Sequence, residues 1–184
     1  MASIITATTT SGLTQSADNS GVLQLASGTG NLVTIPSVTG TAMVSGNMPA
    51  FSAYASGADQ SISDSTRTKV LFATEDFDTN NNFASSRFTP TVSGYYQING
   101  SLTSQTSTGT ISRTIIYIYK NGSTYRRGGD ISGLGFGVNI SDVVYLNGST
   151  DYVEIYALIT TSGSASIGRG ETNTFFSGSM VRAA

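Results

Sequence analysis

The segment from residue 112 to residue 119 constrains the fold of this chain more than any other. It contains the run Ile-Ile-Tyr-Ile at 115–118, and β-branched and aromatic residues favour strands. Asn121-Gly122 follows after a single residue, and this pair is the strongest short-range signal of a hairpin turn. The sequence therefore predicts a strand over 112–119 that turns back on itself at once.

Five further segments have the length and the apolar pattern of short strands. They are residues 69–73, 94–103, 142–146, 152–160 and 173–182. Within 94–103, Tyr96, Ile98 and Leu102 alternate with polar residues, which is the period of a half-buried strand. The sequence carries no convincing apolar period of 3.6 residues, and its 28 Ser, 26 Thr and 21 Gly are poor helix formers. We therefore predict an all-β domain of about eight or more short strands, a sandwich, jelly roll or barrel.

Two missing residue types exclude several kinds of active site. The chain has no His and no Cys, so a Ser-His-Asp triad, a thiol nucleophile and a thiolate zinc site are impossible. Glycan cleavage needs two carboxylates roughly 5–10 Å apart, and none of the 11 acidic residues has a recognisable setting for it. The net charge of −2 also disfavours a nucleic-acid binder. We expect a protein without enzymatic activity.

The composition changes at residue 48. Residues 1–48 contain one charged residue, Asp18, and no aromatic residue, whereas all 9 Tyr and 8 Phe lie from Phe51 onward. A segment without aromatic residues has little bulk for a core of its own. We therefore predict two parts, 1–48 and 49–184. The second part has more aromatic residues than one small core requires, so we expect some of them at a subunit interface.

The first part contains one hairpin signal. Leu23-Gln24-Leu25 and Val33-Thr34-Ile35 alternate apolar and polar residues on either side of a turn-forming stretch at 26–31. An isolated two-stranded hairpin is marginal in water, so this one needs partners, and the simplest partners are copies of itself. We expect the apolar face made by Leu23, Leu25, Val33 and Ile35 to anchor a stalk built from such copies.

An ordered series of short motifs covers nearly all of the second part. The motifs are Phe51-Ser52-Ala53, Phe77-Asp78, Asn80-Asn81-Asn82-Phe83, Phe88-Thr89-Pro90, Gly94-Tyr95-Tyr96, Tyr119-Lys120-Asn121-Gly122 and Phe176-Ser177-Gly178. In order and spacing this series resembles the globular head of complement component one-q, within the tumour-necrosis-factor-like superfamily. The resemblance implies a jelly roll that forms a homotrimer. It departs at Ser149 and Thr150, which separate Gly148 from Asp151, and no collagen-like stem precedes the head.

Residues 17–35 resemble short β modules of bacteriophage tail fibres and related virion proteins. Together the two resemblances imply a structural phage protein, a homotrimeric tail fibre or spike whose knob adheres to a glycan or protein on the host surface. Residues 1–48 would then attach it to another phage structural protein. One alternative is a trimeric decoration or cement protein on the phage capsid, and another is a secreted trimeric ligand of non-viral origin.

The sequence also carries signals of location. The longest strongly apolar run is far shorter than the roughly 20 residues of a transmembrane helix. The first positive charge is Arg67, so a basic signal-peptide region is absent. We therefore expect no membrane insertion, and a protein that is made in the bacterial cytoplasm and released on the virion by lysis.

Asp76, Asp78, Asn80 and Asn82 alternate along the chain, so their oxygens could converge on a hard cation such as Ca²⁺. The segment is not an EF-hand, because Asn81 stands where Gly is required and Arg87 where the bidentate Glu is required. In the alternative, these side chains cap their own backbone. No other cofactor is expected.

Tyr125-Arg126-Arg127 follows the Asn121-Gly122 turn. Two Arg beside a Tyr could bind an acidic sugar or a phosphate, because Arg makes paired hydrogen bonds to oxyanions. In the alternative, they form a solvated strand end or a salt bridge across the trimer, for instance to Asp130. The Gly-rich stretch 128–137 is predicted to be a loop carrying Phe136, either an adaptable binding tip or a tight connection. We expect the receptor contacts at Tyr125, Arg126, Arg127 and Phe136.

Overall fold

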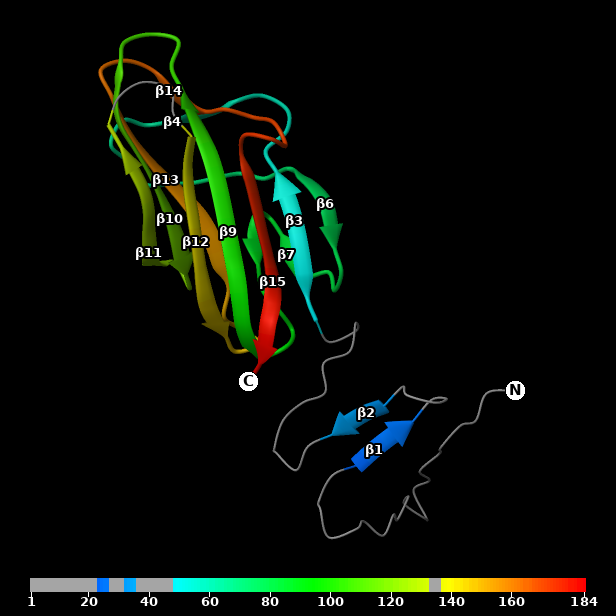
Figure 1. Ribbon diagram of the computed structural model, residues 1–184. Helices are drawn as coiled ribbons and strands as arrows, with labels where there is room; N and C mark the ends of the chain where they lie inside the picture. The colour runs from blue at the N-terminus through cyan, green and yellow to red at the C-terminus, as the bar shows by residue number, and fades with distance from the viewer. Residues whose placement is uncertain (1–22, 27–31, 36–47, 133–136) are drawn as a thin grey trace. The chain divides into compact units, whose positions relative to one another are not determined.

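The computed structural model describes residues 23–26, 32–35, 48–132 and 137–184, and in these ranges it contains strands and no helix (Figure 1). No membrane-spanning helix is therefore found among the described residues. The chain divides into two compact units, Met1–Gly40 and Thr41–Ala184. The domain boundary expected after residue 48 stays a prediction.

The first unit contains an antiparallel pair of strands. β1 (Leu23–Ala26) and β2 (Leu32–Ile35) pair so that Leu23 lies opposite Ile35 and Leu25 opposite Val33. The strands expected from the alternating pattern are therefore present. The side chains of the four expected anchor residues lie outside what the structure describes, so their role stays a prediction.

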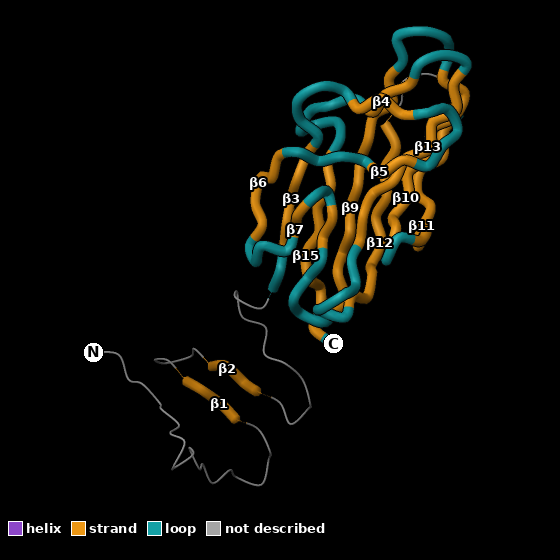
Figure 2. The backbone as a smooth tube through the Cα atoms, turned by 180° about the vertical axis from the view of Figure 1, so that it is seen from behind, coloured by secondary structure: helices purple, strands orange, loops and turns teal. Residues whose placement is uncertain are grey.

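The second unit is a sandwich of two sheets, seen from opposite sides in Figures 1 and 2. One sheet has the order β11-β10-β13-β8-β7, with β5 also paired to β13. Its strands are β5 (Thr68–Lys69), β7 (Phe83–Ala84), β8 (Arg87–Phe88), β10 (Ile111–Lys120), β11 (Ser123–Ile131) and β13 (Val153–Thr161). We call it the six-stranded sheet.

The other sheet has the order β4-β14-β9-β15-β3-β6, with β12 paired to β9. Its strands are β3 (Ala50–Tyr54), β4 (Gln60–Ile62), β6 (Thr74–Asp78), β9 (Gly94–Gln105), β12 (Gly137–Leu146), β14 (Ala165–Ile167) and β15 (Phe175–Ala183). We call it the seven-stranded sheet. All the described strand pairs are antiparallel.

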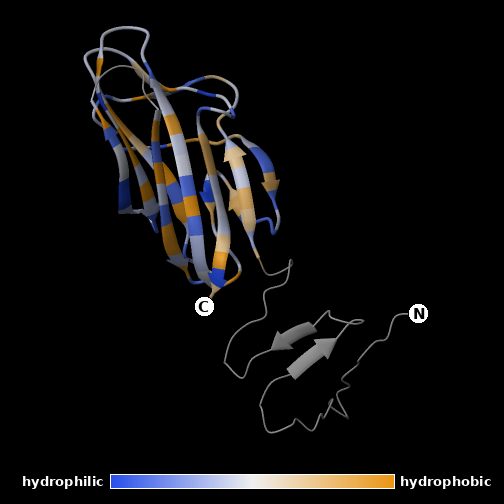
Figure 3. Ribbon diagram, viewed as in Figure 1, coloured by the Kyte–Doolittle hydropathy of each residue, from blue (hydrophilic) through white to orange (hydrophobic). Residues whose placement is uncertain are grey.

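The core lies between the two sheets and is filled by alternate residues of their strands. Tyr96 and Ile98 of β9 and Ile116 of β10 are fully buried there, and the alternation can be followed along β9 and β12 in Figure 3. Phe51 stacks on Phe88 at 4.4 Å between ring centroids and meets other phenylalanine rings nearby. This burial of apolar side chains stabilises the sandwich.

The all-β jelly-roll prediction is confirmed, and so are most of the predicted strands. Segments 94–103, 112–119, 152–160 and 173–182 lie largely in β9, β10, β13 and β15, while 142–146 is only the second half of β12. Asn121 and Gly122 join β10 to β11 with φ angles of 52° and 77°. Such left-handed angles at both positions are those of the tight hairpin turn that Asn-Gly favours.

The strand expected over 69–73 is wrong. The ladder ends at Lys69, and β6 begins only at Thr74. Val70 and Phe72 are buried, which explains the apolar alternation. However, side chains bond the intervening amides: Leu71 N donates to Gln60 Oε1 and Phe72 N to Ser86 Oγ. The apolar alternation indicates which side chains are buried, and here alternate side chains are buried although the segment forms no strand.

The loop expected over 128–137 is also wrong at both ends. Gly128 to Ile131 belong to β11, and Gly137 opens β12. Gly128 on β11 allows a close approach to Ile140 on β12, because a Cβ on it would lie 2.6 Å from Ile140 Cβ. Whether the stretch is a binding tip or a connection depends on residues 133–136. These residues, Phe136 among them, lie outside the described part of the chain.

Candidate functional site

Three of the four predicted receptor-contact residues, Tyr125, Arg126 and Arg127, lie on β11, the edge strand of the six-stranded sheet. Tyr125 is exposed, and the Arg126 guanidinium carbon lies 5.4 Å from its ring centroid. Arg126 Nε also pairs with Asp142 Oδ2 on β12, which raises the pKa of Arg126. The ion pair between Arg126 and Asp142 therefore joins the two sheets at their edge.

Arg127 is paired within its own chain. It bonds Asp130, whose carboxylate also accepts two hydrogen bonds from Arg113, at 2.8 Å from Nε and 2.7 Å from Nη2. The salt bridge that the sequence suggested across a trimer is therefore present within one chain. Asp130 is shared by two guanidinium groups, so this strand end keeps one net positive charge. Receptor contact by Tyr125, Arg126 and Arg127 stays a prediction.

The oxygens of the acidic segment are engaged in local hydrogen bonds. Asp78 Oδ2 accepts from Phe83 N at 2.7 Å, and Asp78 Oδ1 accepts from Asn80 N at 3.3 Å. Asn82 Oδ1 accepts from Thr91 N, and its Nδ2 donates to Asn80 O. Asp78 and Asn82 thus cap backbone groups, which was the alternative to cation binding for this segment.

Asp76 has a different partner from Asp78. It sits at a bulge where β6 pairs with β3, and its Oδ2 accepts from Ser52 Oγ at 2.8 Å. Within the described ranges, no three acidic side chains group as they would around a metal ion. Cation binding by Asp76, Asp78, Asn80 and Asn82 stays a prediction.

The seven-stranded sheet presents a free face that the sequence did not single out. The alternate residues of β9, β12 and β15 that point away from the core form it, and we call it the open face. Tyr95 lies opposite Tyr145 across the β9–β12 pair, with ring centroids 5.5 Å apart. These two residues, Val143 and Val181 are between 41% and 59% exposed. Together with the exposed Arg182, which lies opposite Tyr95 on β15, they make one end of the open face, which we call its apolar end.

The middle of the open face is polar and made of short side chains. Asn99 lies opposite Ser141 on β12 and Ser177 on β15. Ser141 Oγ donates to Asn99 Oδ1 at 2.9 Å, and Gln97 Nε2 donates to Ser141 Oγ at 2.8 Å. A mutually bonded row of this kind keeps the centre of the face flat and fixed.

The six-stranded sheet carries an aromatic cluster on its outer face. Tyr117 and Tyr119 point away from the core and are buried against Tyr156, which stacks on Tyr119 at 3.8 Å. Burial raises the pKa of Tyr156. Arg67 covers the cluster, with its guanidinium carbon 4.9 Å from the centroid of Tyr117. This outer face therefore packs aromatic side chains beneath an exposed arginine.

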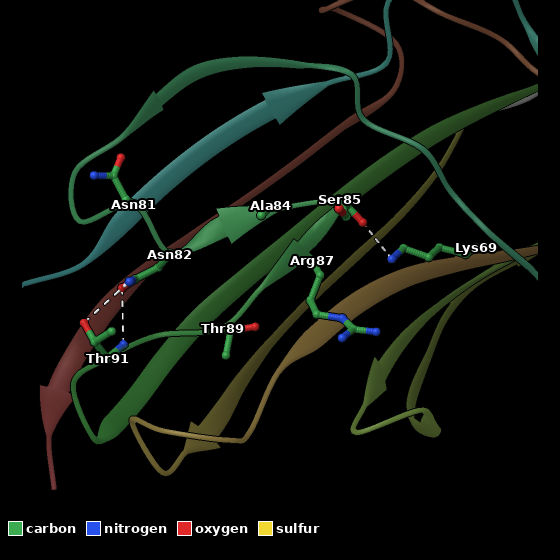
Figure 4. Close-up of a pocket in the computed structure, with 8 residues that line it drawn as sticks. All are labelled: Lys69, Asn81, Asn82, Ala84, Ser85, Arg87, Thr89 and Thr91. Carbon is green, nitrogen blue, oxygen red and sulfur yellow. Dashed lines mark hydrogen bonds between the residues drawn. The ribbon is translucent and has the colours of Figure 1, made fainter.

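A pocket of about 460 Å³ is lined by residues of β5, β7 and β8 and of the loops beside them. Lys69 and Arg87 line one end of it and Asn81, Asn82 and Thr91 the other, as Figure 4 shows. We call it the Lys69–Arg87 pocket. None of its residues belongs to the sites predicted from the sequence except Asn82. Lysine and arginine far apart in the chain give no local motif, so sequence reasoning could not find it.

One buried carboxylate holds both cations of this pocket. Glu154 on β13 is 2% exposed, and its Oε1 accepts from Lys69 Nζ at 2.7 Å and from Arg87 Nε at 2.8 Å. The bond to Glu154 raises the pKa of Arg87. Lys69 Nζ also donates to Ser85 O at 2.8 Å, and the Arg87 guanidinium lies 3.8 Å from the Tyr152 ring centroid.

Comparison with known proteins bears on the fold. No protein-family model and no curated protein matches the sequence. Among solved structures, murine APRIL at pH 8.5 is 14% identical with a TM-score of 0.53, covering 73% of this chain and 99% of that one. The globular domain of zebrafish complement 1qA is 17% identical with a TM-score of 0.52, covering 74% and 99%.

A third similar structure is the Eiger TNF of S. frugiperda. It is 11% identical with a TM-score of 0.54, and the alignment covers 75% of this chain and 95% of that one. At these identities the likeness concerns the fold. The chain therefore carries the jelly-roll fold of the tumour necrosis factor and complement one-q heads.

Proposed function

We propose that this chain is a non-enzymatic structural protein of a bacteriophage virion, a homotrimeric tail-fibre or spike-type appendage whose head adheres to the host cell surface. The observation that carries the proposal is the apolar end of the open face. Tyr95, Val143, Tyr145 and Val181 remain solvent-exposed there in a single chain.

The open face has the character of a contact between identical subunits. Clustered exposed apolar side chains beside polar ones mark protein interfaces. The short side chains of Asn99, Ser141 and Ser177 beside them leave room for another copy to approach closely. Closed rotational symmetry is the common arrangement of identical chains, and three copies fit a fold that resembles trimeric heads.

The hairpin β1–β2 supports the stalk of this proposal. Two strands alone are marginal in water, because they bury little apolar surface. Three copies would bury together what one hairpin leaves exposed. Residues 1–48 would in this way both join the subunits and attach them to another virion protein.

Three heads on one stalk would make adhesion effective even if each contact were weak. Once one head is bound, the others are held at a high effective concentration near the surface. The receptor would be a glycan or a protein of the host surface. A capsid decoration protein would use the same trimer, so the position of the protein on the virion, at the tail or over the head, distinguishes the two functions.

The first test is the native mass in solution by light scattering. The expected value is three times the chain mass of 19.1 kDa. Val143→Asp would bury a charge in the proposed interface, and we expect it to shift the mass towards that of the monomer. Leu71→Asp is the matched control, since Leu71 is also an exposed aliphatic residue but lies off this face.

Two results would contradict parts of the proposal. A wild-type protein that is monomeric at all concentrations would refute the trimer and the avidity that depends on it. Labelled antibody bound over the phage head rather than the tail would favour the decoration protein instead. Adsorption of purified protein to host cells tests adhesion directly.

A further inference from the structure

We propose that the Lys69–Arg87 pocket binds an acidic sugar unit, with its anionic group at Arg87 and its hydroxyls along the neighbouring polar wall. This inference rests on the proposed adhesive function and names the chemistry of its receptor. The pocket volume of about 460 Å³ falls within the range of roughly 300–1,000 Å³ found for small-molecule sites.

The charge balance of the pocket favours an anion. Lys69 and Arg87 face a single carboxylate, Glu154, so the group carries one net positive charge, whereas the whole chain carries −2. Glu154 is buried and already accepts from both cations. A further anion would therefore complete the charge balance instead of displacing an existing partner.

The guanidinium of Arg87 is positioned for such an anion. Its Nε is bonded to Glu154, and its guanidinium carbon lies 3.8 Å from the centroid of the Tyr152 ring, so two contacts hold the group. Within the described part of the chain, neither of its terminal amino groups has a hydrogen-bond acceptor. Two parallel N–H groups of one planar guanidinium match the oxygens of a carboxylate or phosphate. Little rotational freedom would be lost on binding.

The rest of the pocket offers groups for hydroxyls. Figure 4 shows Thr89 and Ala84 between the end lined by Lys69 and Arg87 and the end lined by Asn81 and Asn82. Asn82 is fixed by its bonds to Asn80 and Thr91, and Asn81 at the rim is exposed. A ligand with one charged group and several hydroxyls fits a site that is cationic at one end and neutral but polar along its length.

The test is a titration of the full chain with small probes, followed by NMR. Glucuronate and glucose 6-phosphate are the anionic probes, and glucose and inorganic phosphate are the controls. We expect the anionic sugars to bind at least about tenfold more tightly than glucose, because a charge-assisted hydrogen bond pair contributes that much. The stronger of the two identifies a carboxylated or a phosphorylated receptor.

Two variants and one control locate the binding. Arg87→Gln should weaken glucuronate binding by about tenfold or more. Ala84→Glu should do the same from the middle of the pocket while leaving the ion pairs of Glu154 intact. Arg113→Gln is the matched control, because the two arginine side chains are 45% and 43% exposed on the same sheet, and it should change affinity less than twofold.

Equal binding of glucose and glucuronate would overturn the proposal, and so would inorganic phosphate binding as tightly as any sugar. An equal loss in Arg113→Gln would show general charge attraction and would also overturn it. If Arg87→Gln lost the probe but adsorbed to host cells normally, the pocket would not be the adhesive site, although the adhesive head would stand. If wild-type protein bound the probe but no cells, the proposed function would fail instead.

Discussion

Asn121 Nδ2 donates a hydrogen bond of 2.8 Å to Asp151 Oδ1, and this bond ties the β10–β11 turn to the loop that leads into β13. Asn121 Oδ1 in turn accepts from Tyr152 N at 3.0 Å. Lys120 Nζ pairs with the other carboxylate oxygen at 2.9 Å. Asp151 is thus the carboxylate on which one end of the six-stranded sheet converges.

Asp151→Asn should destabilise the fold at pH 7. The change removes the charge that Lys120 and Asn121 contact, and hydrogen bonds to a charged group contribute about 1–3 kcal/mol. Urea unfolding at a fixed protein concentration measures the loss, because assembly would make stability depend on concentration. Asp64→Asn, at another turn of the head, is a useful comparison. An unchanged midpoint in Asp151→Asn would contradict this account.

The same carboxylate predicts a pH dependence. The hydrogen bond from Asn121, followed by the bond from Lys120, lowers the pKa of Asp151 below its ordinary value of 3.8. A carboxyl with a lowered pKa stabilises the fold above that ordinary value and ceases to do so as the pH falls through its folded pKa. The stability gap between wild type and Asp151→Asn should therefore be largest near pH 7 and close below about pH 4. A gap of the same size at pH 2 would contradict the assignment.

Gly128→Ala should destabilise the sandwich at the β11–β12 edge. The added Cβ would lie 2.6 Å from Ile140 Cβ and 2.9 Å from Asn139 O, so a strand must move. Overpacking of this kind costs about 1–3 kcal/mol. Gly137→Ala is the control, since the nearest described atom to its Cβ would be Thr103 Oγ1 at 3.7 Å. Equal unfolding midpoints in the two variants would argue against the close approach of these strands.

The sequence predicted the long strands well because their signals are local. The run at 115–118 and the Asn121-Gly122 turn specify β10 and its hairpin with β11 without reference to the rest of the chain. The failure at 69–73 has the opposite origin. There the amides of Leu71 and Phe72 bond side chains of Gln60 and Ser86, and no periodicity can reveal such partners.

The candidate sites were harder to predict, because their geometry joins distant segments. The local sequence left open whether Arg126 binds an anion or forms a salt bridge, and its partner Asp142 lies 16 residues away on the other sheet. Lys69 and Glu154 are separated by 85 residues. Two cations that share one buried carboxylate can be recognised only once the strands that carry them are paired.

Glu154→Gln should be the most damaging single change among the ion pairs of the described chain. Glu154 is 2% exposed, and Glu154→Gln would leave Lys69 and the partly exposed Arg87 without the charge of the carboxylate that they share. Hydrogen bonds to a charged group contribute about 1.5–3 kcal/mol, and solvent does not screen a carboxylate buried this deeply, so we expect a loss in that range. Asp130→Asn provides the contrast. It also removes a carboxylate shared by two arginines, but the Asp130 side chain is 28% exposed, so solvent screens its ion pairs and we expect a change of at most about 1 kcal/mol. If urea unfolding gave equal losses for the two variants, burial of Glu154 would not be what makes its ion pairs matter.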